Sequence, residues 1–184
     1  DKISIFRYSD IAIYKCIRTH NSKPGLQKEV IMIRKLTLDA QQSTMSLTAE
    51  IWDNFAKAIK EIDPKLTIPD SYKEFMFENN GGSFVEYILK DTPAGDLVVS
   101  SFYPWDKDRE ISLNVVLENS EEINEGFLPF ADDPGGNYYL LNLNHEGNGQ
   151  VYYWLHDSEF ENGDNKVLLF DTFANFLNSL QPED

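Results

Sequence analysis

The stretch that decides the fold runs from Pro134 to Asp157 and reads PGGNYYLLNLNHEGNGQVYYWLHD. Residues 138–143 place successive side chains on opposite faces if they are extended, which is the period-two pattern of a strand. Val151–Leu155 form a second strand-like run, and residues 144–149 between the runs hold Gly and Asn, which tolerate left-handed backbone angles. We therefore predict an aromatic β-hairpin. Because a strand pair is barely stable alone, the rest of the chain must cover one of its faces.

Length and charge exclude several classes of protein. The chain has 184 residues, 41% of them hydrophobic, which is enough to bury a core. Its net charge of -15 argues against nucleic acid as a ligand, because phosphate binding depends on Lys and Arg. An acidic surface instead favours a basic protein as partner.

The sequence predicts a soluble, cytoplasmic protein. It contains no apolar run long enough for a membrane-spanning helix and no basic-then-apolar signal segment at its start. The single cysteine, Cys16, excludes an internal disulfide framework. Because the chain opens on Asp1 rather than Met, we expect that residues once preceding it have been removed or left out.

The charge divides the chain into two units. Residues 1–44 hold eight Lys or Arg against four Asp or Glu, whereas residues 45–184 hold eight against twenty-seven. The first unit contains three short β-branched runs, Ile3–Phe6, Ile11–Ile17 and Val30–Leu38. We therefore predict a basic, strand-rich N-terminal extension or fusion over 1–44, followed by an acidic domain over 45–184.

The acidic domain begins with two predicted helices. Trp52, Phe55, Ile59 and Ile62 recur at helical spacing, with Ser46 or Thr48 as the N-cap and Asp63-Pro64 as the end. Pro69 suits the first turn of the second helix, and Gly81 is its expected stop.

The remaining elements are mostly strands. We expect strands at Ser83–Leu89 and Leu97–Tyr103, a short strand at Phe127–Ala131 and another at Lys166–Phe170. The run Ile111–Ile123 fits either alternation or a helical period, and we favour a helix. Asp171 or Thr172 caps a last helix, which carries Phe173, Phe176, Leu177 and Leu180 and precedes a polar tail, QPED.

The order and spacing of these motifs over about residues 46–181 resemble the SUKH superfamily. The motifs are I-P-x-S-Y-K-x-F, N-N-G-G, F-A-x-D-x-G-G-N, Y-Y-L-L-N-L, V-Y-Y-W-x-H-D and F-x-x-F-L. The matching residues are Pro69, Tyr72, Phe75, Asn80, Gly81, Gly82, Phe130, Gly136, Asn137, Tyr138, Val151, Trp154, His156, Asp157, Phe173, Phe176 and Leu177. The resemblance implies an α+β domain with a mostly antiparallel sheet flanked by helices, no cofactor, and function by protein binding. The superfamily is named partly for fungal regulators of glucan synthesis, and its bacterial members include immunity proteins of polymorphic toxin systems.

The residues themselves give little support to catalysis. No G-x-S-x-G elbow, P-loop or dinucleotide fingerprint is present, and the three His and one Cys lack metal-ligand spacing. His156 and Asp157 are an imidazole and a carboxylate side by side, but adjacent strand residues point to opposite faces, so we favour a surface turn. Asp132 and Asp133 fit a turn better than a calcium loop. We predict a protein that is not an enzyme and uses no metal or cofactor.

The candidate site residues are the aromatic and acidic side chains that a partner could contact. Large amphipathic rings dominate binding hot spots, and carboxylates steer a basic partner. The candidates are Trp105, Asp106, Asp132, Asp133, Tyr138, Tyr152, Trp154, His156 and Asp157. The favoured function is an immunity protein that neutralises a basic toxin, such as a nuclease, by binding it directly. The alternative is a regulatory or scaffolding module of the glucan-synthesis-regulator type.

Overall fold

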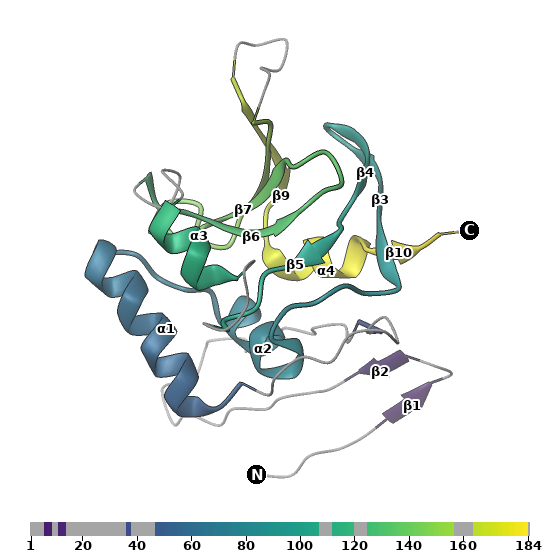
Figure 1. Ribbon diagram of the computed structural model, residues 1–184. Helices are drawn as coiled ribbons and strands as arrows, with labels where there is room; N and C mark the ends of the chain where they lie inside the picture. Colours follow the sequence, from purple (N-terminus) through teal and green to yellow (C-terminus); the bar gives the residue numbers. More distant parts are fainter. Residues whose placement is uncertain are drawn as a thin grey trace, which may run out of the picture.

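The computed structural model describes residues 6–8, 11–13, 36–37, 47–106, 112–119, 125–156 and 164–183, which form an α+β fold as the sequence predicts (Figure 1). The helices are α1 (Ala49–Ile62), α2 (Asp70–Asn79), α3 (Leu113–Asn119) and α4 (Phe173–Ser179). The strands are β1 (Phe6–Tyr8), β2 (Ile11–Ile13), β3 (Glu86–Thr92), β4 (Gly95–Val98), β5 (Ser101–Phe102), β6 (Phe127–Asp132), β7 (Tyr138–Asn142), β8 (Val151–Trp154), β9 (Lys166–Phe170) and β10 (Gln181–Pro182). No helix among these residues is long and apolar enough to cross a membrane.

The strands of the acidic domain form two antiparallel sheets. One has the order β10-β3-β4 and the other the order β5-β6-β7-β8-β9. The residues between β4 and β5 pass from the first sheet to the second, since Val99 donates its N–H to the carbonyl of Tyr87 and Ser100 donates to that of Asp132 (both 2.8 Å). The predicted hairpin therefore forms the centre of the larger sheet. Strands β1 and β2 pair with each other.

The core lies between the larger sheet and helices α2 and α4, which Figure 1 shows on the same side of that sheet. The ring of Tyr72 in α2 lies 6.1 Å from that of Phe130 in β6 and 5.1 Å from that of Phe173 in α4. All three side chains are almost completely buried. Edge-to-face pairs of this kind stabilise a core beyond the area that they bury.

The helix limits agree closely with the sequence prediction. Thr48 is the N-cap of α1, its Oγ1 accepting from the N–H of Ile51 (3.2 Å), and Thr172 caps α4 in the same way with Asn175 (3.1 Å). The run Ile111–Ile123, which fits either strand alternation or a helical period, is helical over Leu113–Asn119. Helix α2 stops one residue earlier than predicted, because Asn80 already adopts the left-handed conformation at φ 46°.

Some strand expectations need correction or fall outside the described residues. Strand β3 begins at Glu86 rather than Ser83, since Gly82 bridges to Phe102 and Val85 donates its N–H to the carbonyl of Thr37. The single strand expected at Leu97–Tyr103 is two strands, β4 and β5, which belong to different sheets. The polar tail contains a strand that the sequence did not predict, β10, which pairs with β3. Apart from β1, β2 and residues 36–37, the strand-rich extension predicted for 1–44 lies outside the described part of the chain.

Candidate functional site

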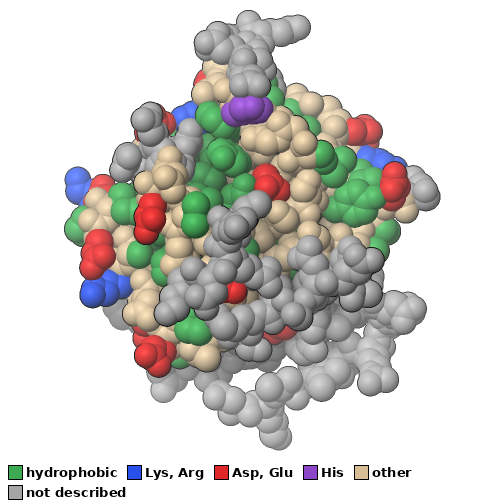
Figure 2. Space-filling view, in the orientation of Figure 1, with side chains coloured by type: hydrophobic (Ala, Val, Ile, Leu, Met, Phe, Trp, Pro, Cys, Tyr) green, Lys and Arg blue, Asp and Glu red, His purple; other side chains and the backbone are tan. Residues whose placement is uncertain are grey.

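The two faces of the β7–β8 hairpin have different environments. Tyr139, Leu141, Val151 and Tyr153 point into the core, with exposed fractions of 5% or less. Tyr138, Tyr152 and Trp154 are half-buried and lie on the opposite face, which we call the outer face. In the space-filling view, hydrophobic side chains form a band across the side of the molecule where the larger sheet lies (Figure 2).

Five residues form a row across the outer face. Ser101 pairs with Asp132, Asp132 with Tyr138, Tyr138 with Trp154, and Trp154 with Lys166. Directly opposite residues of an antiparallel pair share a face, so these side chains lie side by side across five strands. We call Ser101, Asp132, Tyr138, Trp154 and Lys166 the outer row.

The middle of the outer row is a stacked aromatic pair. The rings of Tyr138 and Trp154 lie 5.3 Å apart with 10° between their planes. Tyr103 meets Tyr138 edge-on at 6.4 Å and is itself buried. The pair therefore rests on packed neighbours while part of each ring stays in contact with solvent.

Asp132 adds a carboxylate to the outer row. Its Oδ1 accepts hydrogen bonds from the N–H and hydroxyl of Ser101 (3.2 and 3.0 Å), and its Oδ2 accepts from the hydroxyl of Tyr103 (3.2 Å). Partial burial raises the pKa of Asp132, and the nearby charge of Asp133 acts in the same direction, although the hydrogen bonds oppose it. These donors are all neutral groups.

Asp133 is held in the turn that follows β6. It accepts from the N–H groups of Gly135 and Asn137, from the side-chain amide of Asn137 (3.0 Å) and from the hydroxyl of Tyr153 (2.5 Å). Burial acts to raise the pKa of Asp133, but the hydrogen bonds outweigh it and the pKa is lowered. The carboxylate therefore keeps its charge, and its donors too are neutral.

Asn137 links this turn to the end of the hairpin. Its Oδ1 accepts from the backbone N–H of His156 (3.3 Å) and lies 3.2 Å from Nδ1 of the exposed His156 ring. Asp157, the predicted neighbour of His156, lies outside the described residues.

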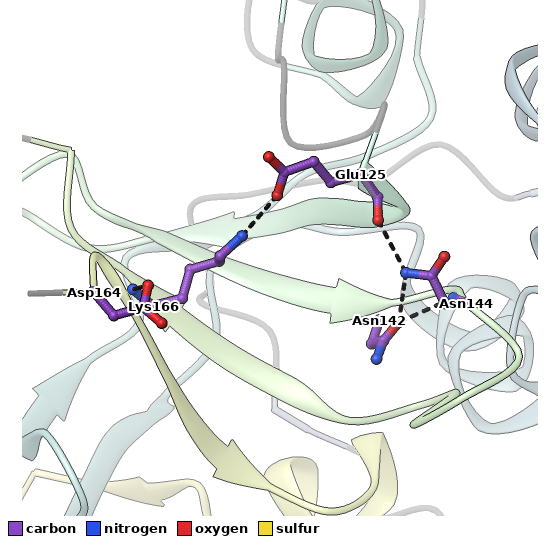
Figure 3. A network of polar contacts seen from close by, with 5 residues as sticks. All are labelled: Glu125, Asn142, Asn144, Asp164 and Lys166. Atoms are coloured by element: carbon purple, nitrogen blue, oxygen red, sulfur yellow. Dashed lines mark hydrogen bonds and ion pairs between the residues drawn. The ribbon is translucent and has the colours of Figure 1, made fainter. Parts of the chain in front are cut away.

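Lys166 closes the other end of the outer row. Its Nζ lies 2.7 Å from a carboxylate oxygen of Glu125 and 4.8 Å from the centre of the Phe127 ring. Figure 3 shows the side chain reaching from β9 towards Glu125, whose carbonyl accepts from Asn144 (3.0 Å). Lys166 is thus paired within the domain, whereas the donors to Asp132 and Asp133 carry no charge.

A protein-family model for the SMI1 / KNR4 family (SUKH-1) matches residues 47–179. The chain belongs to this family. A search of the curated proteins finds no match, and neither does a search of the solved structures. SUKH domains are in general non-catalytic binding domains.

The SUKH-1 fold brings together only some of the predicted site residues. Asp132, Asp133, Tyr138, Trp154 and His156 meet where β6 and β8 end and β7 begins. Tyr152 shares the outer face but packs edge-on against Phe127, 5.3 Å away, and donates its hydroxyl to Gln150 (3.1 Å).

Trp105 and Asp106 lie elsewhere. The ring of Trp105 packs 5.0 Å from that of Phe55 in α1, and the backbone N–H of Trp105 donates to Oδ1 of Asn80 (3.1 Å). Trp105 thus joins the N-N-G-G motif to α1. Asp106 is half-buried next to it in the chain.

Sequence reasoning missed the neutral donors around the two carboxylates. Ser101, Tyr103 and Tyr153 are distant from Asp132 and Asp133 in sequence, and only strand register brings them close. The spacing of Asp133, Gly135 and Asn137 was an available signal, because an Asp followed by Gly and Asn is typical of a turn closed by its own side chains.

Proposed function

We propose that this SUKH-1 domain binds a basic protein through the outer row and the adjoining Asp132–Asp133 turn. Tyr138 and Trp154 supply a rigid aromatic platform, since their positions are fixed by stacking and by the strands that carry them. Rigid, partly exposed aromatic residues lose little conformational entropy on binding and are enriched at hot spots.

The carboxylates of Asp132 and Asp133 favour binding of a cation beside the Tyr138–Trp154 pair. Asp132 and Asp133 carry two negative charges close to one another, and the donors that hold them are neutral. A partner Arg or Lys would meet the carboxylate of Asp132 and the faces of the aromatic rings together. This juxtaposition of a stacked pair with two carboxylates, whose donors among the described residues are neutral, is the observation that carries the proposal.

The surrounding charge acts in the same direction. Residues 45–184 hold twenty-seven acidic against eight basic side chains, so the domain attracts basic surfaces before contact. A nuclease binds phosphates through Lys and Arg, so its substrate-binding surface is basic. We therefore favour an immunity protein that neutralises a toxin of this kind, with a regulatory or scaffolding role as the alternative.

The experiment pairs this chain with the protein encoded beside its gene. Both are purified, mixed and followed by size-exclusion chromatography, and the toxicity of the neighbour is measured with and without co-expression. The immunity proposal expects a stable complex and loss of toxicity, and both effects should weaken in Trp154→Ala. No complex together with unchanged toxicity would contradict it.

A further inference from the structure

Two residues ahead of the family-matched region are bound to the domain. The match begins at residue 47, yet Leu36 has an exposed fraction of 2% and belongs to the hydrophobic core. Thr37, the next residue, is exposed but is fixed by three hydrogen bonds, two to Glu86 at the beginning of β3 and one to Val85 just before it. The contact therefore joins a segment outside the family domain to a strand inside it.

This contact combines one main-chain hydrogen bond, two hydrogen bonds to a side-chain carboxylate and one buried apolar side chain. The carbonyl of Thr37 accepts from the N–H of Val85 (2.8 Å), as in strand pairing. The N–H and hydroxyl of Thr37 both donate to the carboxylate of Glu86, at 2.8 and 3.0 Å. Main-chain hydrogen bonds with a buried side-chain anchor are the features of peptide recognition by strand addition.

Glu86 contributes to recognition because it is largely buried. Its exposed fraction is 8%, so its hydrogen bonds to Thr37 form in a medium where charge-assisted bonds are stronger than in water. The carboxylate of Glu86 accepts from the backbone N–H and the hydroxyl of Thr37, and the core accommodates the apolar side chain of the preceding residue, Leu36. The matching ligand is therefore an extended segment in which an apolar residue precedes Thr or Ser.

We propose that the beginning of β3 is a peptide-docking site that this chain fills with its own Leu36–Thr37. Residues 38–46 connect the segment to α1, so it acts as a tethered ligand with a high effective concentration. The opposite charges of residues 1–44 and 45–184 favour the docked state. The site is separate from the outer row and does not depend on the function proposed above.

The test uses the full chain with the tethered anchor weakened. Leu36→Asp removes the apolar anchor, and a fluorescent peptide of residues 33–41 is then titrated by anisotropy. We expect the peptide to bind this variant at least tenfold more tightly than the unaltered chain, whose site is already filled. The same peptide carrying Leu36→Asp is the matched control and should not bind.

Hydrogen exchange at the Val85 amide gives a second measurement. Exchange should be slow in the unaltered chain, faster in Leu36→Asp, and slow again when the peptide is added. Thr37→Val, which removes only the hydroxyl of an exposed residue, should speed exchange several-fold and serves if Leu36→Asp fails to fold. The proposal would be overturned if the Leu36→Asp chain folds and its Val85 amide still exchanges slowly, or if this chain does not bind the peptide. Unchanged exchange at Val85 in Thr37→Val would also overturn it.

Discussion

Tyr138 and Trp154 face each other across β7 and β8, and their rings stack 5.3 Å apart, 10° from parallel, on the side of the sheet that points away from the core. The neighbouring pair, Tyr139 and Tyr153, points the opposite way and is buried. One hairpin therefore places one aromatic pair in the core and another on the outer face of the sheet.

The two environments predict different costs for removing a tryptophan. Trp52 in α1 is 5% exposed and contacts Phe55, so Trp52→Ala should lower the free energy of unfolding by about 3–5 kcal/mol. Trp154 is half-buried, so Trp154→Ala should cost less: about 0.5–1.5 kcal/mol for the lost ring pair, together with the smaller apolar area that Trp154 buries. Urea unfolding followed by circular dichroism measures both, and equal losses would show that Trp154 is a core residue.

Gly81, in the N-N-G-G motif, should be more sensitive to substitution by Ala than a glycine with open space around it. Gly81 has φ 81°, and a Cβ there would lie 2.6 Å from the backbone nitrogen of Pro104. Gly81→Ala should cost about 2–5 kcal/mol, because overpacking against fixed backbone adds to the left-handed strain.

Gly95 is the matched control for Gly81. Its φ is 88°, but a Cβ there meets nothing within 4 Å. Gly95→Ala should therefore cost only the left-handed strain, about 1–2 kcal/mol. If the two variants unfold at the same urea concentration, the clash between an added Cβ at position 81 and the backbone of Pro104 does not add to the cost of the substitution.

The lowered pKa of Asp133 predicts a loss of stability in acid. A carboxyl whose pKa is lower in the folded than in the unfolded chain stabilises the fold above its unfolded pKa, and this contribution disappears as the pH falls through the folded pKa. Asp133→Asn should remove this part of the decline, so that its stability deficit at pH 7 shrinks towards pH 3. Urea midpoints across this range measure the effect, and a deficit that is constant with pH would contradict the assignment.

Much of the fold could be predicted because local physics decides it. Thr48 and Thr172 cap helices through their own neighbours, and the alternation in residues 138–143 gives both faces of β7. The sequence could not show which face is buried, because Tyr and Leu occur on both sides of the hairpin. That choice depends on where Phe130, Phe173 and Phe176 pack, which is set by the tertiary fold.

The candidate site was less predictable for the same reason. The sequence places Trp105 beside an acidic cluster, and it could not show that Asn80 and Phe55, distant in sequence, hold Trp105 against α1 and away from the outer row. Conversely, the partners of Asp132 come from β5 and from the residues just after it, and nothing in the spacing of Ser101 and Tyr103 indicates this contact.

Binding affinities of single variants test the central claim most directly. Isothermal titration of the protein encoded beside the gene would compare the unaltered chain with Trp154→Ala and Phe77→Ala. Phe77 is the matched control, because it is 40% exposed on α2 and lies against Trp52 rather than in the outer row. We predict that Trp154→Ala raises Kd at least tenfold, or about 1.4 kcal/mol, while Phe77→Ala changes it less than twofold. An unchanged Kd for Trp154→Ala in a folded chain that still forms the complex would contradict the claim that the outer row is the binding surface.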